Sequence, residues 1–353
     1  MKSRNIALDY AKGAGILIVV FAHLFRGLWG AGLLKGLDPD VIAAISSTCT
    51  ILSMPTFFLV SGLLYGGNMA KRHGLKEFAG KFDAIFYPYV VWSVIVGAFE
   101  VFAAGWSNHG ATLHDLHDIL WNPHGIFWFL YALLLAFALV ELMIYAMGVA
   151  WAKRLVLPVG VGLILIEPWM PHIFALHEIC MSFLYFGLGI VLVEWVPKTQ
   201  IPSWLKFAAL AAVLFAIEYV AHFHMDAGTH SPRAITPNAI LTALISLFVL
   251  MWMCYSLPSG LSKLAYLGER SMDIYVTHLL FIAPVRMVLN KFAGVHDVSI
   301  YLAVGMLVGI VGPLLFTDYL KKTVLICLFQ PPSFLSLKNR LVVPPSRKQV
   351  DAN

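Results

Sequence analysis

The sequence predicts an all-α protein: a polytopic membrane bundle of about ten transmembrane helices with both termini in the cytoplasm. Of its 353 residues, 60% are hydrophobic and 12% are charged, whereas a soluble domain carries about 25% charged residues. The apolar residues form long runs, and at about 20 residues per crossing they suffice for roughly ten helices. The basic residues are also sorted between alternate loops. This composition excludes a soluble enzyme, a nucleic-acid-binding protein and a disordered chain.

Ten apolar runs, each bounded by polar residues, proline or glycine, are the expected helices. The first contains His23 and Arg26 and lacks a small-residue cleavage site, so we expect an uncleaved span rather than a signal peptide. Only the segment after Phe329 lacks the character of a membrane span, which predicts a membrane domain over 1–330 and a cytoplasmic tail over 331–353. The expected spans are 13–34, 41–65, 84–104, 126–147, 151–167, 173–195, 204–222, 237–257, 272–290 and 299–320.

Lysine and arginine predict the orientation of these spans. About 18 of the 24 basic residues fall in one set of loops and in the two ends of the chain. The alternate loops hold only Lys35, Arg233, Arg286 and Lys291. Because cytoplasmic loops carry an excess of Lys and Arg, we expect both termini on the cytoplasmic side. Because the basic residues are sorted by membrane side, the net charge of +5 does not indicate a nucleic-acid partner.

The cysteines and the external histidines do not predict a metal site. Each of the four cysteines lies alone in an apolar run and is expected to be a small core residue. His114 and His117 in the external loop 106–125 are three residues apart, a spacing that metal ligands also use. No second ligand pair accompanies them, so we expect a polar loop at the membrane surface. Glu178 is likewise expected near the external interface.

Two ionisable residues mark the first span. Lys12 and His23 are eleven residues apart, which is close to three helical turns, so they share one helix face about 16 Å apart along the axis. The orientation places Lys12 at the cytoplasmic interface and His23 near the midplane. Lys12 extending to lipid headgroups and His23 bonding a neighbouring helix would explain both residues. Alternatively, His23 could transfer protons in catalysis, because a histidine inside the membrane can act as a general acid or base.

A second histidine, His278, lies early in the run 272–290, roughly 10 Å from its cytoplasmic end. Tyr275 precedes it by three residues and faces the same way. Two histidines at similar depth on helices entering from the same side are consistent with one buried polar site.

The loop between the second and third runs is strongly basic, with Lys71, Arg72, Lys76 and Lys81. Membrane topology alone explains such a loop. The functional alternative is a phosphate-binding surface for an anionic cytoplasmic substrate.

Taken together, these residues resemble the acyltransferase 3 family of integral membrane acyltransferases. Five segments carry the resemblance, in the order in which the family has them, and they span most of the chain. They are Leu8-Asp9-x-x-Lys12-Gly13 with His23; Phe58-Leu59-Val60-Ser61-Gly62 with the basic loop; Phe86-Tyr87-Pro88-Tyr89-x-x-Trp92; Trp128-Phe129-Leu130; and Gly268-x-x-Ser271-x-x-Ile274-Tyr275-x-x-His278.

The resemblance implies a substrate pair. Members of the family move an acyl group, commonly acetyl and sometimes succinyl, from a cytoplasmic coenzyme A thioester to a carbohydrate, often an extracytoplasmic glycan or its lipid-linked precursor. It therefore implies an acyl-CoA donor, no metal, a location in the cytoplasmic (inner) membrane, and membrane lipids and a glycan acceptor as partners. The chain would be a stand-alone membrane module, and its oligomeric state is not indicated.

The resemblance also implies roles for particular residues. His23 would be the catalytic histidine, supported by His278 and Tyr275. Lys12, which stands where many relatives have Arg, would hold the donor, and the family's loop arginines would be replaced by Arg72, Lys76 and Lys81. Asp9 and Trp128, which lie in the matching motifs, are assigned to substrate binding.

A transporter or flippase is the competing class. Intramembrane histidines also relay protons or line a substrate path, and ten spans suit that function equally well. A transporter would leave its substrate unmodified and would not consume acyl-CoA.

Overall fold

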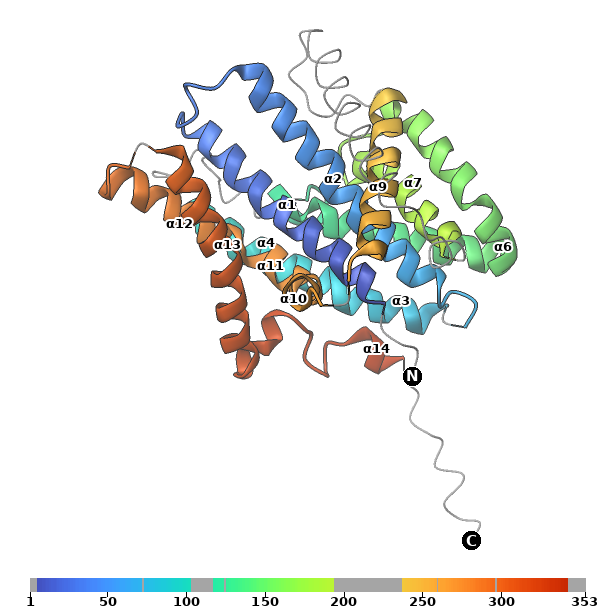
Figure 1. Ribbon diagram of the computed structural model, residues 1–353. Coiled ribbons are helices and arrows are strands. Elements are labelled where there is room, and N and C mark those ends of the chain that lie inside the picture. Colours follow the sequence, from blue (N-terminus) through green and yellow to red (C-terminus); the bar gives the residue numbers. More distant parts are fainter. Residues whose placement is uncertain are drawn as a thin grey trace.

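The computed structural model describes most of the chain, and every regular element in that part is a helix (Figure 1). The all-α prediction is therefore confirmed for these residues. The described residues are 5–71, 73–102, 117–123, 125–193, 237–258, 260–295 and 297–341.

Seven long helices make up the body of the part of the chain that the structure describes, and short helices connect them. The long ones are α1 (Ile6–Gly30), α2 (Pro39–Gly66), α4 (Tyr87–Phe102), α6 (Trp128–Ile166), α7 (Leu176–Leu192), α9 (Pro237–Ser256) and α13 (Val298–Lys321). The short ones are α3 (Leu75–Lys81), η1 (Phe82–Phe86), η2 (Asp118–Leu120), η3 (Gly125–Phe127), η4 (Glu167–Trp169), α10 (Ser262–Glu269), α11 (Ser271–Thr277), α12 (Leu279–Met287), η5 (Val288–Phe292), η6 (Val324–Leu328) and α14 (Leu337–Arg340).

Five helical stretches in the described ranges are long and apolar enough to cross a membrane, and a sixth is formed if α11 and the helix after it count as one span bent by 46°. α7 and Ala243–Ser256 are apolar but shorter. The predicted run 204–222 lies outside the described residues. Each of the other nine predicted runs coincides with helix, and 126–147 and 151–167 both fall in α6, which breaks at Gly148 (φ 79°). The total of ten crossings stays a prediction.

α1 is the central helix of the bundle. It packs against α2, α9, α10 and α13 and also contacts α11 and α12 (Figure 1). Tyr10, Ala11, Val20 and Leu28 along its length are fully buried. Small residues permit this packing, because they let helix backbones approach closely in a membrane protein.

Glycines form the closest of these contacts. Gly268 in α10 lies directly against the backbone of Asp9 in α1, and Gly13 lies against Leu264. Gly62 in α2 lies against the Phe186 carbonyl of α7. A side chain at any of these positions would separate the two helices.

The described part of the predicted tail packs onto the bundle. The Asp83 carboxylate accepts hydrogen bonds from Ser336 Oγ (2.7 Å) and from the Leu337 and Lys338 amides (3.0 and 3.1 Å). Phe329 is buried against Trp92, with 5.2 Å between ring centroids. Packing therefore continues past residue 330, and the domain boundary there stays a prediction.

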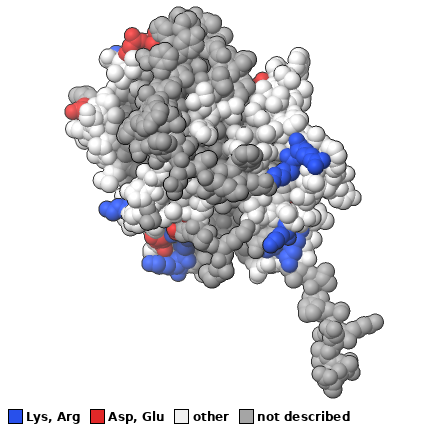
Figure 2. Space-filling view, turned by 45° about the vertical axis from the view of Figure 1, so that its right-hand side comes forward, with Lys and Arg blue, Asp and Glu red and all other residues white. Residues whose placement is uncertain are grey.

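Among the described residues visible in Figure 2, Lys and Arg stand in a few separate groups and most of the remaining surface is neither Lys, Arg, Asp nor Glu. Three of the four cysteines (Cys49, Cys180 and Cys254) are buried, as expected of core residues, and Cys327 is half-buried.

The glycine contacts predict a large stability difference between two similar substitutions. G268A places a methyl group against the Asp9 backbone, so we expect a loss of about 1–3 kcal/mol from overpacking. G162A is the control, because its methyl group would meet no atom within 4 Å and alanine favours a helix. Thermal unfolding of the purified variants in detergent measures both. Equal melting temperatures would contradict the packing argument.

Candidate functional site

His23 and His278, which are distant in the sequence, lie together inside the bundle. Their ring centroids are 5.2 Å apart and the rings are tilted by 51°. His23 projects from the middle of α1. His278 stands at the junction of α11 and α12, where the helix axis bends. His278 is fully buried, whereas His23 is partly exposed.

Backbone hydrogen bonds fix the tautomer of His278. Its Nδ1 lies 2.7 Å from the Tyr275 carbonyl oxygen and 3.1 Å from that of Ile274. Carbonyls only accept, so Nδ1 carries the proton and Nε2 presents a lone pair. Nε2 is buried and bonds to no residue in the described part of the chain. A buried acceptor without a partner is costly, so this nitrogen is available to His23 or to a bound molecule.

Two arginines bond to the backbone of α1 close to His23 in sequence, at Ala22 and Gly27. Arg26 donates from Nε to the Ala22 carbonyl of its own helix (3.1 Å). Arg286 is 8% exposed and donates to the Gly27 carbonyl near the end of α1. Sequence analysis counted Arg286 among external loop charges, whereas the structure places it in α12. Its position within the predicted run 272–290 was the feature of the sequence that could have indicated this.

Tyr275 is buried in α11 and its hydroxyl donates to the Ile126 carbonyl of η3. Its ring packs edge-on against Phe129 at 5.4 Å and lies 6.2 Å from the His278 ring. With its hydroxyl bonded to the backbone, Tyr275 positions α11 against the start of α6.

A cavity of about 230 Å³, the inner cavity, extends between Lys12 and Tyr275. Most of its lining is apolar, so it suits a slender uncharged chain. Neither His23 nor His278 lines the inner cavity, but the ring of Tyr275 on its wall lies 6.2 Å from the His278 ring. Its lining residues are Lys12, Phe57, Ser61, Ala84, Ile85, Phe129, Leu130, Leu133, Ser271, Met272 and Tyr275.

Lys12 is the one predicted donor-binding residue that the structure places on the inner cavity. Its Nζ lies 2.7 Å from Oδ1 of the buried Asp9, so Asp9 is the ionic partner of Lys12. Lys76 is exposed on α3, and Lys81 Nζ lies 4.9 Å from the centre of the Phe137 ring. Arg72 lies outside the described residues.

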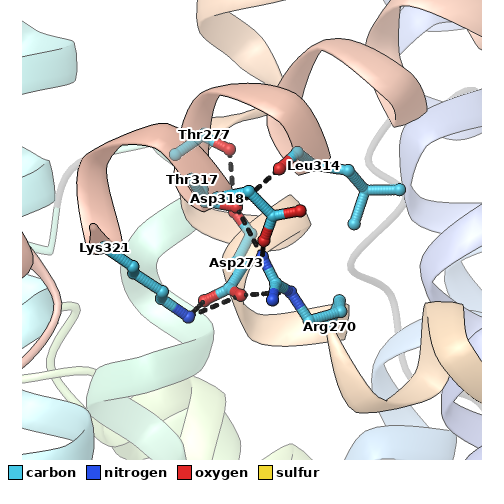
Figure 3. Close-up of polar contacts among 7 residues, drawn as sticks. All are labelled: Arg270, Asp273, Thr277, Leu314, Thr317, Asp318 and Lys321. Atoms are coloured by element: carbon cyan, nitrogen blue, oxygen red, sulfur yellow. Dashed lines mark hydrogen bonds and ion pairs between the residues drawn. The ribbon is translucent and has the colours of Figure 1, made fainter.

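A charged cluster that sequence analysis did not assign holds α11 against α13 (Figure 3). Arg270 and Lys321 converge on the buried Asp273: Arg270 Nε lies 2.8 Å from Oδ2, and Lys321 Nζ lies 2.7 Å from both oxygens. Arg270 also donates to Thr317 (3.1 Å) and Asp318. The feature of the sequence that could have indicated this cluster is the pair of charged residues, Arg270 and Asp273, at the start of the run 272–290.

Trp128 does not line the inner cavity. It faces a second cavity of about 310 Å³, the outer cavity, together with Asn122, His172 and Glu178. The resemblance assigned Trp128 to substrate binding, but the sequence did not indicate that Trp128 would line a cavity separate from that of Lys12.

The described residues contain no group of three or more His, Cys, Asp or Glu side chains placed to hold a metal ion. His117 lies 3.2 Å from Asp118, while His114 lies outside the described part of the chain.

Fold and site together define an integral membrane protein whose apolar helices surround a histidine pair and a cavity that Lys12 lines. Residues 5–318 match the family model of the acyltransferase domain. The chain therefore belongs to the acyltransferase 3 family, and the resemblance drawn from its motifs is confirmed.

Similarity to curated proteins covers only part of the chain. It is 25% identical over 140 residues to the nodulation protein NolL of Sinorhizobium fredii (strain NBRC 101917 / NGR234), covering 40% of this chain and 37% of that protein. It is 20% identical over 148 residues to NolL of Mesorhizobium japonicum (strain LMG 29417 / CECT 9101 / MAFF 303099), covering 40% and 36%. The aligned region thus spans less than two-fifths of either relative. No solved structure matches.

The charged cluster predicts unequal effects for its two carboxylates. D273N removes the charge between Arg270 and Lys321 and leaves both cations without that partner, so we expect a loss of about 1–3 kcal/mol. D318N is the control: its carboxylate is 41% exposed, and exposed ion pairs contribute about 1 kcal/mol or less. Thermal unfolding in detergent at neutral pH compares them, and a larger loss in D318N would refute this ranking.

Proposed function

We propose that the protein is a membrane O-acyltransferase that moves an acyl group, acetyl in the simplest case, from cytoplasmic acyl-CoA to a hydroxyl of a cell-surface or lipid-linked carbohydrate. The observation that carries the proposal is the pairing of His23 with His278 beside the inner cavity. Membership of the family supports acyl transfer. The donor, the acceptor and the residue roles are our inference.

Lys12 is proposed to hold the donor at the cytoplasmic side. Coenzyme A is an anionic nucleotide joined to a long uncharged arm, and an ammonium group binds phosphate as a point charge. Lys12 lines the inner cavity, whose apolar wall suits the arm. The separation of about 16 Å along α1 between Lys12 and His23 is spanned by such an arm and not by an ion pair. Arg72, Lys76 and Lys81 would add positive charge on the same side.

His23 is proposed as the general base. Its exposed fraction admits a substrate, and its ring makes no hydrogen bond to the residues that the structure describes. The bare Nε2 of His278 is suited to accept the N–H of His23, which would leave the other His23 nitrogen unprotonated and facing the acceptor. Tyr275 would position this pair.

The transfer step follows from that arrangement. His23 takes the proton of an acceptor hydroxyl while the oxygen attacks the thioester carbonyl carbon. A C–O bond forms, the C–S bond breaks, and the departing sulfur takes the proton from His23 to become the free thiol. Transfer through an acyl group held on His23 uses the same residues. Acid-quenched protein containing labelled acyl-histidine would identify that second route.

The proposed topology has ten spans, with both termini on the cytoplasmic side of the inner membrane. The starts of α1, α3, α10 and α14 lie toward one end of the bundle (Figure 1), and Lys12, Lys76 and Lys263 belong to that end. The Lys and Arg distribution supports placing this end in the cytoplasm.

A transporter or flippase is the alternative, because a histidine pair inside a bundle can relay protons. Consumption of acyl-CoA by the purified protein separates the two functions, since a transporter returns its substrate unmodified.

His23→Ala is expected to lower acyl transfer at least 100-fold, because general-base catalysis typically contributes 10²–10⁴. Membranes supplied with labelled acetyl-CoA measure transfer to glycan. His73→Ala, in an exposed loop, is the control and should retain the wild-type rate. Full activity of the His23 variant would refute its catalytic role.

Lys12→Gln is expected to raise the KM for acyl-CoA about tenfold, because it removes one charge-assisted contact to phosphate. The same variant should use acyl-pantetheine, which lacks the nucleotide phosphates, as well as the wild type does. Lys263→Gln, which changes an exposed lysine at the same end of the bundle, is the control and should leave the KM for acyl-CoA unchanged. An equal defect with both donors would show that Lys12 does not bind phosphate.

A further inference from the structure

The outer cavity lies between the start of α6 and the start of α7, and the established family membership assigns it no role. Its volume is about 310 Å³, larger than that of the inner cavity. By the proposed topology it opens at the external end of the bundle. It is lined by Asn122, Pro123, Gly125, Trp128, His172 and Glu178.

Two side chains of this lining have polar groups without a partner among the described residues. They are the carboxylate of the half-buried Glu178 and the side-chain amide of Asn122. Trp128 is half-buried at the cavity wall. A half-buried carboxylate is more costly without hydrogen bonds than with them, so a ligand that supplies donors would be favoured here.

The residues behind this lining are held in place. His172 packs on His177 with 4.7 Å between ring centroids, and His177 Nδ1 lies 2.7 Å from Glu167 Oε1. The Nε2 of His177 is buried and has no partner in the part of the chain described. The His172 ring of the cavity lining is therefore in contact with the His177–Glu167 pair.

The turn that leads into α7 is strained. Phe174 and Ala175 have φ of 54° and 51°, a region that costs residues other than glycine about 1–2 kcal/mol. The Phe174 amide donates to the Trp121 carbonyl, which ties this turn to the 117–123 segment. Strain of this kind is kept where the surrounding structure requires a particular geometry.

One short segment lines both cavities. Gly125 and Trp128 face the outer cavity, whereas Phe129 and Leu130 face the inner one. The Trp128 and Phe129 rings are 6.4 Å apart and nearly perpendicular. The carbonyl oxygen of Ile126, the residue after Gly125, accepts a hydrogen bond from the Tyr275 hydroxyl. The outer and inner cavities therefore have neighbouring walls, to which consecutive residues at the start of α6 contribute.

We propose that the outer cavity binds an uncharged sugar residue of the acyl acceptor. The Trp128 ring would pack against the apolar face of the sugar, and Glu178 and Asn122 would bond its hydroxyls. No lysine or arginine lines the cavity among the described residues, and Glu178 repels a carboxylate or phosphate. The ligand class is thus a neutral saccharide. This inference rests on the proposed function and identifies where its acceptor is held.

Binding is tested without any acyl donor. Pro123→Cys puts a thiol on the cavity wall, against native cysteines that are buried or half-buried. Intact cells are labelled with a membrane-impermeant maleimide in the presence of glucose, galactose, N-acetylglucosamine, maltose or cellobiose. At least one of these sugars should slow labelling fivefold or more, while glycerol and glucuronate should not. Protection by none of the sugars, or equal protection by glycerol, overturns the proposal.

Two tryptophan variants test whether the Trp128 ring packs against the sugar. Adding Trp128→Ala should abolish the protection, whereas Trp169→Ala, at a ring that is 78% exposed and outside the lining, should keep it. Protection that survives Trp128→Ala overturns the assignment.

Kinetics separate this proposal from the proposed function. Glu178→Gln should raise the KM for the glycan acceptor about tenfold and leave the Kd for acyl-CoA unchanged. A parallel change in both constants indicates a structural role and overturns the inference. If the wild type transfers no acyl group, the proposed function fails, while the labelling result still decides whether the outer cavity binds sugar.

Discussion

The close approach of α1 to the helices α10–α12 is the contact on which the other features depend. It requires glycine at 268 against the Asp9 backbone and at 13 against Leu264. With the helices this near, His23 meets His278 and Lys12 borders the same cavity as Tyr275. A larger residue at either glycine would move the two histidines apart, so helix packing and the chemistry of the site are determined together.

Polar groups inside the bundle fall into two classes. Asp273, Arg270 and Lys321 neutralise one another and bond neighbouring side chains, as buried charges must. The Nε2 of His278 and the carboxylate of Glu178 make no such bonds among the described residues. The first class anchors α11, and the second marks the surfaces that we propose to contact substrates.

The segment 125–130 contributes residues to the walls of both cavities. Gly125 and Trp128 face the outer cavity, Phe129 and Leu130 face the inner one, and the Ile126 carbonyl accepts a hydrogen bond from the Tyr275 hydroxyl. Two cavities with neighbouring walls would suit the reaction that we propose, in which the donor comes from the cytoplasmic side and the acceptor from the external side.

The sequence by itself determined the apolar helices and the shared face of Lys12 and His23, since hydropathy and the 3.6-residue period are local properties. It also drew attention to His278 and Tyr275, although not to their partners. Only the tertiary structure decided that His278 meets His23, that Asp9 is the ion-pair partner of Lys12, and that Arg286 bonds to the Gly27 carbonyl of α1. It also placed Trp128 in a cavity separate from Lys12, and left Lys76 and Lys81 away from both cavities. The physical reason is that these relations depend on which helices pack together and at what rotation, and that is decided by contacts such as Gly268 with Asp9, between residues far apart in the chain.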